Sequence, residues 1–194
     1  MKASWTRWGL LVALGGCASA PPPPAPTVQS TPVADAASVP AMPTSRPDDV
    51  ASADAIIRAL YDVISGPPGQ DRDWNRFRSL FADDARLIIA APSAEGHVPS
   101  RSMTVEEYIA AADPFLKRDG FWEREIARRT ERYGNVTHLF STYESRVNTA
   151  DSPPFARGIN SIQLVTDGQR WWVVTILWDF ERPGNPIPAE YLPR

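Results

Sequence analysis

Cysteine, histidine and lysine are scarce in this sequence, and each shortage excludes a class of site. One Cys in 194 residues rules out a disulfide within the chain, and together with two His it leaves no spacing that would ligate a metal ion. Lysine is nearly absent and the net charge is −3, so no clustered basic surface is available for the phosphates of a nucleic acid. No glycine-rich phosphate loop or nucleophile elbow is present. We therefore expect no metal, no other cofactor and no nucleic-acid partner.

Long apolar runs are also missing. The run near the N-terminus, Trp8 to Leu14, is shorter than the roughly 20 residues that span a bilayer. Lys2 and Arg7 precede it, which is the layout of a secretory signal. The run ends in Leu14-Gly15-Gly16-Cys17, which resembles the lipobox of bacterial lipoproteins. In that family the Cys becomes the first mature residue and carries lipid on its thiol and amine, which would explain why the chain has one Cys.

The lipobox resemblance implies a protein anchored in the bacterial cell envelope through lipid on Cys17. Ala18 stands where an Asp commonly marks inner-membrane retention, so the resemblance implies the outer membrane, facing the periplasm. The alternative is cleavage after Ala18-Ser19-Ala20 and secretion without lipid. Residues 1–20 are thus predicted to be a lipoprotein signal peptide, residues 21–50 a disordered tether rich in Pro, Ala and Ser, and residues 51–194 one folded domain.

Helical patterns occupy the first half of this domain. Apolar residues at helical spacing predict a helix over 51–66, and a second helix is expected over 71–85, with Trp74, Phe77 and Phe81 on one face. A capping box, Thr104 to Glu107, predicts a third helix, which Pro114 kinks or restarts and Gly120 closes. A short buried strand is expected near residues 85–91, among the helices.

The second half of the domain is typical of strands. Segments 121–132 and 136–147 flank a turn at Gly134-Asn135, and segments 157–166 and 169–180 flank a turn at Asp167-Gly168. Four consecutive antiparallel strands after helices predict an α+β fold, in which three N-terminal helices pack on one face of a curved, mostly antiparallel sheet.

Three segments in this order, DWNRFRSLFADDARL, TVEEYIAAADPFL and GQRWWVVTILW, resemble the nuclear transport factor 2-like superfamily. That superfamily includes SnoaL-like cyclases, ketosteroid isomerase and subfamilies of unknown function. The resemblance implies a cone-shaped domain with a pocket between sheet and helices, and it implies a homodimer. It does not imply an activity, because the superfamily mixes enzymes with binding modules.

Side-chain alternation divides the last hairpin into two faces. A two-residue turn at Asp167-Gly168 places Asn160, Thr175 and Asp179 on one face together with Trp171. The resemblance aligns that face with the pocket. The opposite face is then the expected dimer interface, and it carries Arg157, Ser161, Gln163, Trp172 and Trp178. A register error of one residue reverses the assignment.

The preceding hairpin offers a pair of carboxylates. Its expected register sets Glu125 opposite Glu144 and Glu123 opposite Arg146. Two close carboxylates in a pocket do not both ionise cheaply, so one pKa rises to a value that suits a general acid or base. The alternative is a solvated face on which Arg124, Arg128 and Arg146 neutralise the carboxylates.

Other side chains could also carry chemistry. Asp83 is either a general base at the pocket mouth or an Asp that fixes a helix end. His138 is either a base near neutral pH or a half-buried strand residue. Tyr143 and Asn160 either orient a carbonyl or polar ligand in an apolar cavity or satisfy buried backbone groups.

These observations lead to three functional hypotheses. The first is an envelope lipoprotein whose domain binds a small apolar ligand or a protein partner in or beside the pocket. The second is a cofactor-independent enzyme of proton transfer, namely an isomerase, dehydratase or hydrolase. The third is a structural dimer with a filled pocket.

Overall fold

The computed structural model describes residues 43–90, 92, 96, 98 and 101–194. The predicted signal peptide, Cys17 and residues 21–42 of the predicted tether lie outside this part. Residues at the end of that tether are folded, because Pro47–Val50 form helix α1 and bury Val50. None of the helices within 43–90 and 101–194 combines the length and apolarity needed to cross a bilayer.

Local sequence signals explain the next three helices. Helix α2 (Ala53–Ile64) begins where the Ser52 hydroxyl accepts from the Ala55 N–H. Helix α3 (Trp74–Arg78) is much shorter than predicted, because from Phe81 the chain pairs with the sheet as a strand. Helix α4 (Val105–Asp119) carries the predicted capping box at Thr104 and continues through Pro114 to Gly120.

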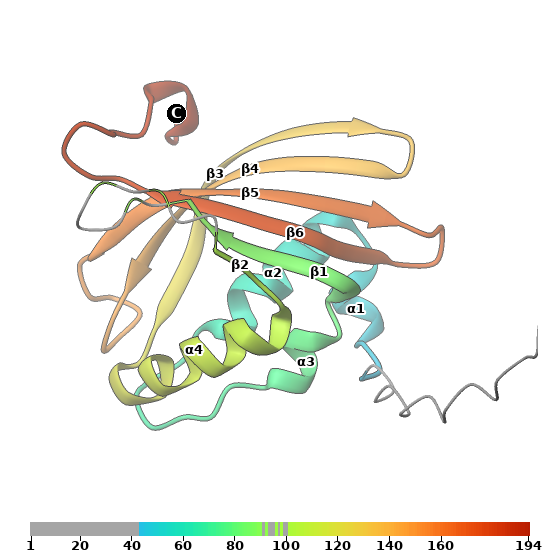
Figure 1. The fold of residues 1–194 in the computed structure, drawn as a ribbon, viewed down its shortest axis with the longest axis horizontal. Coiled ribbons are helices and arrows are strands. Elements are labelled where there is room, and N and C mark those ends of the chain that lie inside the picture. The colour runs from blue at the N-terminus through green and yellow to red at the C-terminus, as the bar shows by residue number, and fades with distance from the viewer. Residues whose placement is uncertain (1–42, 91, 93–95, 97, 99–100) are drawn as a thin grey trace, which may run out of the picture. The chain divides into compact units, whose positions relative to one another are not determined.

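One six-stranded sheet forms the rest of the domain. Its strands are β1 (Phe81–Ile89), β2 (Arg101–Met103), β3 (Trp122–Tyr133), β4 (Val136–Arg146), β5 (Ala156–Thr166) and β6 (Trp171–Phe180). The spatial order is β2-β1-β6-β5-β4-β3, and only the β1–β6 pair is parallel. The sheet curves over α2, α3 and α4, while the C-terminal segment with the 3₁₀ helix η1 (Ala189–Tyr191) lies on its other side (Figure 1). The predicted α+β fold class is confirmed.

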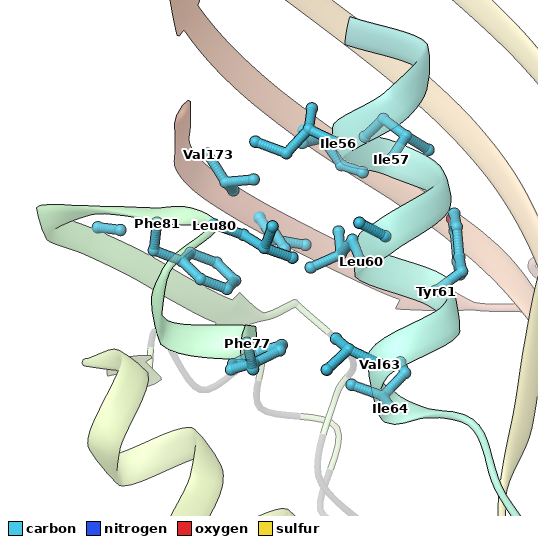
Figure 2. Packing of buried hydrophobic residues seen from close by; sticks show 14 of the residues in the cluster. Ile56, Ile57, Leu60, Tyr61, Val63, Ile64, Phe77, Leu80, Phe81 and Val173 are labelled. Carbon is cyan, nitrogen blue, oxygen red and sulfur yellow. The ribbon is translucent and has the colours of Figure 1, made fainter. Parts of the chain in front are cut away.

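The core lies between α2 and the concave face of the sheet. Ile56, Leu60, Leu80 and Phe81 point toward one another there, with Phe77 below them (Figure 2). Tyr61 leaves α2 on another side than Leu60, toward a different part of the sheet (Figure 2). On α2, Leu60 therefore packs in the core (Figure 2), whereas Tyr61 points toward the cavity described below.

The β3–β4 hairpin keeps its predicted turn but not its predicted register throughout. Near the turn Glu131 pairs with His138, as a turn at Gly134-Asn135 requires, and the pairing then shifts at a bulge between Glu125 and Ala127. Beyond the bulge Glu125 lies opposite Tyr143, not opposite Glu144, and Glu123 lies opposite Ser145. One extra residue in β3 thus turns Glu123 and Glu125 onto the concave face.

The β5–β6 hairpin differs from the prediction at its turn. The Asp167 carboxylate accepts from the N–H groups of Gln169 and Arg170, both at 2.8 Å, which stabilises a four-residue connection. The first strand pair is therefore Thr166 with Trp171. A further shift follows, because Leu164 pairs with Val173 whereas Gln163 pairs with Thr175.

Candidate functional site

A cavity of about 520 Å³ lies between the concave face of the sheet and the helices. Its wall is largely apolar and aromatic: Leu60, Ile64, Phe77, Leu87, Tyr108, Phe121, Tyr143, Phe155, Ile176, Trp178 and Phe180 contribute to it. The size lies in the range of pockets that hold small organic molecules. Because the space is hollow, the domain does not match the hypothesis of a filled pocket.

Glu123 is the carboxylate of the inner cavity wall. The side chain is half-buried, and the part of it that stays accessible faces the cavity. Its Oε2 accepts a hydrogen bond from the Ser145 hydroxyl at 2.7 Å, and its backbone N–H donates to Ser65 Oγ at 3.0 Å. Burial raises the pKa of Glu123 to about 7, and hydrogen bonds from Ser145 and Asn160 oppose the rise only in part. This carboxyl can therefore hold or release a proton near neutral pH.

Three tyrosines from three elements surround this carboxyl. Tyr61 comes from α2, Tyr108 from α4 and Tyr143 from β4, and all three line the cavity. Burial raises the pKa of each phenol, and the negative charge of Glu123 raises it further. The phenols are neutral at physiological pH and serve as hydrogen-bonding groups. Asn160 donates to the Tyr61 oxygen at 3.1 Å and so fixes its position.

Glu125 lies two residues after Glu123 on β3, but its carboxylate is already hydrogen-bonded within the protein. Its carboxylate accepts from Arg128 Nε at 2.9 Å and from the Ser141 hydroxyl, and Arg128 also pairs with Asp54 of α2. The Ser141 hydroxyl is in turn 2.7 Å from the Tyr61 oxygen. Glu125 is absent from the described cavity wall, so its role is to anchor β3 to α2.

The predicted carboxylate pair of Glu125 and Glu144 is wrong. The bulge in β3 puts Arg124 opposite Glu144, whose carboxylate contacts Arg124 Nε at 2.5 Å and Arg146 Nη2 at 2.6 Å. Burial alone would raise the pKa of Glu144, but the hydrogen bonds from Arg146 and Arg124 outweigh it and lower the pKa. This cluster is the neutralised alternative considered above.

Of the other candidates, the structure brings Tyr143 and Asn160 to the cavity wall and leaves four residues away from it. Asp83 is exposed on β1. His138 is bonded through Nε2 to Ser161 Oγ at 2.9 Å. Thr175 and Asp179 do not line the cavity, because the register shift in β6 brings Ile176 and Trp178 there in their place.

The predicted interface residues are only partly on one face. Trp178 lines the cavity, contrary to the prediction, because of the register shift in β6. Arg157 pairs with Glu181 at 2.7 Å, and Trp172 donates from Nε1 to Asp167 at 2.8 Å while Arg170 lies over its ring. Ser161 and Gln163 are half-buried neighbours on β5. The homodimer itself stays a prediction.

Four residues of the site were not predicted from the sequence: Glu123, Tyr61, Tyr108 and Ser145. Tyr61 had a readable signal, since it falls in the buried stripe of α2 between Ile57 and Ile64. Glu123 had none, because its direction depends on the bulge in β3. Within the described ranges no three His, Cys, Asp or Glu side chains gather as ligands for a metal ion.

Comparison with protein-family models finds no match, and comparison with curated proteins finds no similar protein. Solved structures of similar fold exist. A protein of unknown function with a cystatin-like fold from Nostoc punctiforme has 12% identity and a TM-score of 0.47, with 64% of this chain and 84% of that chain covered. An NTF-2 like protein of unknown function from Silicibacter pomeroyi has 13% identity and a TM-score of 0.46, with 68% and 94% covered.

An NTF2-like protein from Cytophaga hutchinsonii has 14% identity and a TM-score of 0.43, with 65% of this chain and 89% of that chain covered. Likenesses at such identities and TM-scores say nothing of activity. The chain's own element order and sheet match what the sequence resemblance implied. The described domain has an α+β fold, in which helices cover one face of a curved six-stranded sheet.

Proposed function

We propose that the domain binds a small, largely apolar molecule in the cavity and holds one polar group of that molecule at Glu123. The observation that carries the proposal is a hollow of about 520 Å³ with aromatic walls and one polar corner, made by Glu123, Ser145 and Asn160. Apolar walls supply the free energy of binding, and a few convergent polar groups fix the orientation of the ligand.

A neutral fluorescent probe tests this proposal directly. N-phenyl-1-naphthylamine should bind the full chain with saturable, one-to-one enhancement of its fluorescence. Ser145→Trp fills the cavity from β4 and should abolish the enhancement, because the indole takes the space of the probe. Ser102→Trp places the same side chain on the exposed surface of β2 and serves as the matched control. Equal probe binding by both variants would contradict the proposal.

Proton transfer is the second candidate function, and the raised pKa of Glu123 favours it. A carboxyl that titrates near pH 7 inside an apolar cavity suits a general base. The test is exchange of the α-protons of 2-tetralone in D₂O, followed by NMR. Wild type should accelerate the exchange and Glu123→Gln should not, while equal rates would exclude this function for Glu123.

A further inference from the structure

We infer that the molecule held in the cavity is a lipophilic amine, whose ammonium group binds against the Glu123 carboxylate among the aromatic rings. The inference rests on the proposed binding function and names the chemical class of its ligand. It follows from the charges and the rings of the cavity wall, taken together.

The charge of the cavity wall is of one sign. Glu123 lies in the inner wall and Glu181 at the end of β6, whereas no Lys, Arg or His is among the described residues that line the cavity. Glu181 is already paired with Arg157 at 2.7 Å. The Glu123 carboxylate has hydrogen bonds but no cation within the described residues that contact it. An anionic ligand would meet only like charge, and a cationic one would complete an ion pair.

The rings around Glu123 select among cations. Tyr108, Tyr143, Phe121 and Trp178 come from four different segments and wall the same space. The negative faces of aromatic rings attract alkylammonium groups, and apolar walls exclude a strongly hydrated ion such as Na⁺. A carboxylate within aromatic walls therefore suits an ammonium that carries an apolar body of its own.

The charge state of this site depends on pH. The groups that face Glu123 are Tyr61 from α2, Tyr108 from α4 and Tyr143 from β4, and burial keeps all three phenols neutral below pH 10. Glu123 is then the group that titrates. With a pKa of about 7, its ionised fraction falls from about nine tenths at pH 8 to about one tenth at pH 6. The affinity for an amine should fall with it by about tenfold.

The experiment compares three probes of one shape by calorimetry on the full chain: biphenyl-4-methylamine, biphenyl-4-methanol and biphenyl-4-carboxylate. At pH 8 the amine should bind about tenfold more tightly than the alcohol, and the carboxylate most weakly. Glu123→Gln should remove the advantage of the amine over the alcohol, so that the two probes bind the variant alike. Glu131→Gln makes the same chemical change at an exposed site of β3 and should alter neither affinity.

The outcomes separate the inference from the function on which it rests. Equal binding of amine and alcohol by wild type, or tightest binding of the carboxylate, would overturn the amine and leave ligand binding in place. Failure of all three probes to bind would overturn both. The pH profile of wild type needs no variant, so the test stands even if Glu123→Gln does not fold. An amine affinity that is the same at pH 6 and pH 8, and no higher than that of the alcohol at either pH, would also overturn the inference.

Discussion

At the scale of single residues, Glu123 makes the domain less stable as pH rises. Its pKa in the folded chain, about 7, lies above the usual value of 4.5 for a Glu in the unfolded chain. Below pH 4.5 both states are protonated and the residue costs nothing. Between pH 4.5 and 7 the unfolded chain releases the proton first, so stability falls with rising pH, by up to about 3 kcal/mol.

Glu123→Gln removes this cost because the amide keeps the shape of the side chain without the charge. We expect urea unfolding of the variant to match wild type at pH 4 and to exceed it at pH 8, by up to about 3 kcal/mol. The exposed Glu131→Gln should show no such divergence. A difference between Glu123→Gln and wild type that does not grow from pH 4 to pH 8 would mean that Glu123 titrates as an ordinary carboxyl.

Gly158 on β5 is the residue on which the position of Tyr143 depends. A Cβ at this position would lie 2.5 Å from the Tyr143 oxygen and 2.4 Å from the backbone oxygen of Asp179. Neither neighbour can move freely, since one belongs to the cavity wall and the other to the adjacent strand. Gly158→Ala should therefore cost about 1–3 kcal/mol of stability, measured by urea denaturation, and weaken binding of the naphthylamine probe. Unchanged stability would show that β5 and β6 separate easily here.

At the scale of elements, Arg76 of α3 ties the first helices together. Its guanidinium makes two hydrogen bonds to Asp49 of α1, at 2.7 and 2.9 Å, and one to Asp62 of α2 at 2.5 Å. The side chains of Arg76 and Asp49 are only 15% and 12% exposed. The hydrogen bonds from Arg76 hold the pKa of Asp49 below its usual value, so the pair stabilises the fold at neutral pH and is lost as acid protonates Asp49.

Arg76→Ala should destabilise the domain by about 3 kcal/mol, because it leaves the largely buried carboxylate of Asp49 without its cation. Thermal unfolding followed by circular dichroism measures the loss. Arg46→Ala removes an exposed pair with Asp73 and is the control, expected to cost no more than about 1 kcal/mol. Similar losses for the two variants would contradict a special role for Arg76.

The features of these elements that the sequence predicts well depend on residues close together in the chain. The stripe of α2, the capping box of α4 and the turn at Gly134-Asn135 each depend on residues a few positions apart. The parallel pairing of β1 with β6 joins residues about 90 positions apart, and nothing in either segment specifies it. The length of α3 depends on that pairing and was overestimated for this reason.

The residues of the candidate site also divide into those that local sequence patterns predicted and those that they did not. Asn160 was predicted because alternation places it with Trp171 on the face that the resemblance aligns with the pocket, and Tyr143 was predicted because its phenol could orient a ligand. Glu123 and Trp178 were not, because each reaches the cavity only after a register shift in its strand. A bulge inserts one residue and reverses every side chain beyond it, and it is favoured by packing between strands and not by the residue itself. The centre of the site is thus the part that the sequence pattern could not place.

At the scale of the whole molecule, the outer face of the sheet bears on the predicted homodimer. The C-terminal segment already covers part of it, since Thr142 Oγ1 donates to the Tyr191 carbonyl at 2.6 Å and the Phe140 and Tyr191 rings lie 5.3 Å apart. Leu177 and Ser161 remain accessible beside this segment. If a second copy packs there, Ser161→Arg should convert a dimer into a monomer in sedimentation velocity, by burying an unpaired charge. A wild-type monomer at micromolar concentration would contradict the dimer.

The lipid anchor proposed from the sequence is tested at Cys17. Acyl chains on this residue would hold the chain in a membrane, because each buried methylene contributes about 0.8 kcal/mol. We expect the full chain, expressed in a bacterium, to fractionate with the membranes and to incorporate labelled palmitate. Cys17→Ala should lose the label and appear in the soluble envelope fraction, whereas Ser19→Ala, two residues away, should behave as wild type. Membrane retention of Cys17→Ala would exclude lipidation as the anchor, and a soluble wild type would favour secretion after Ala20.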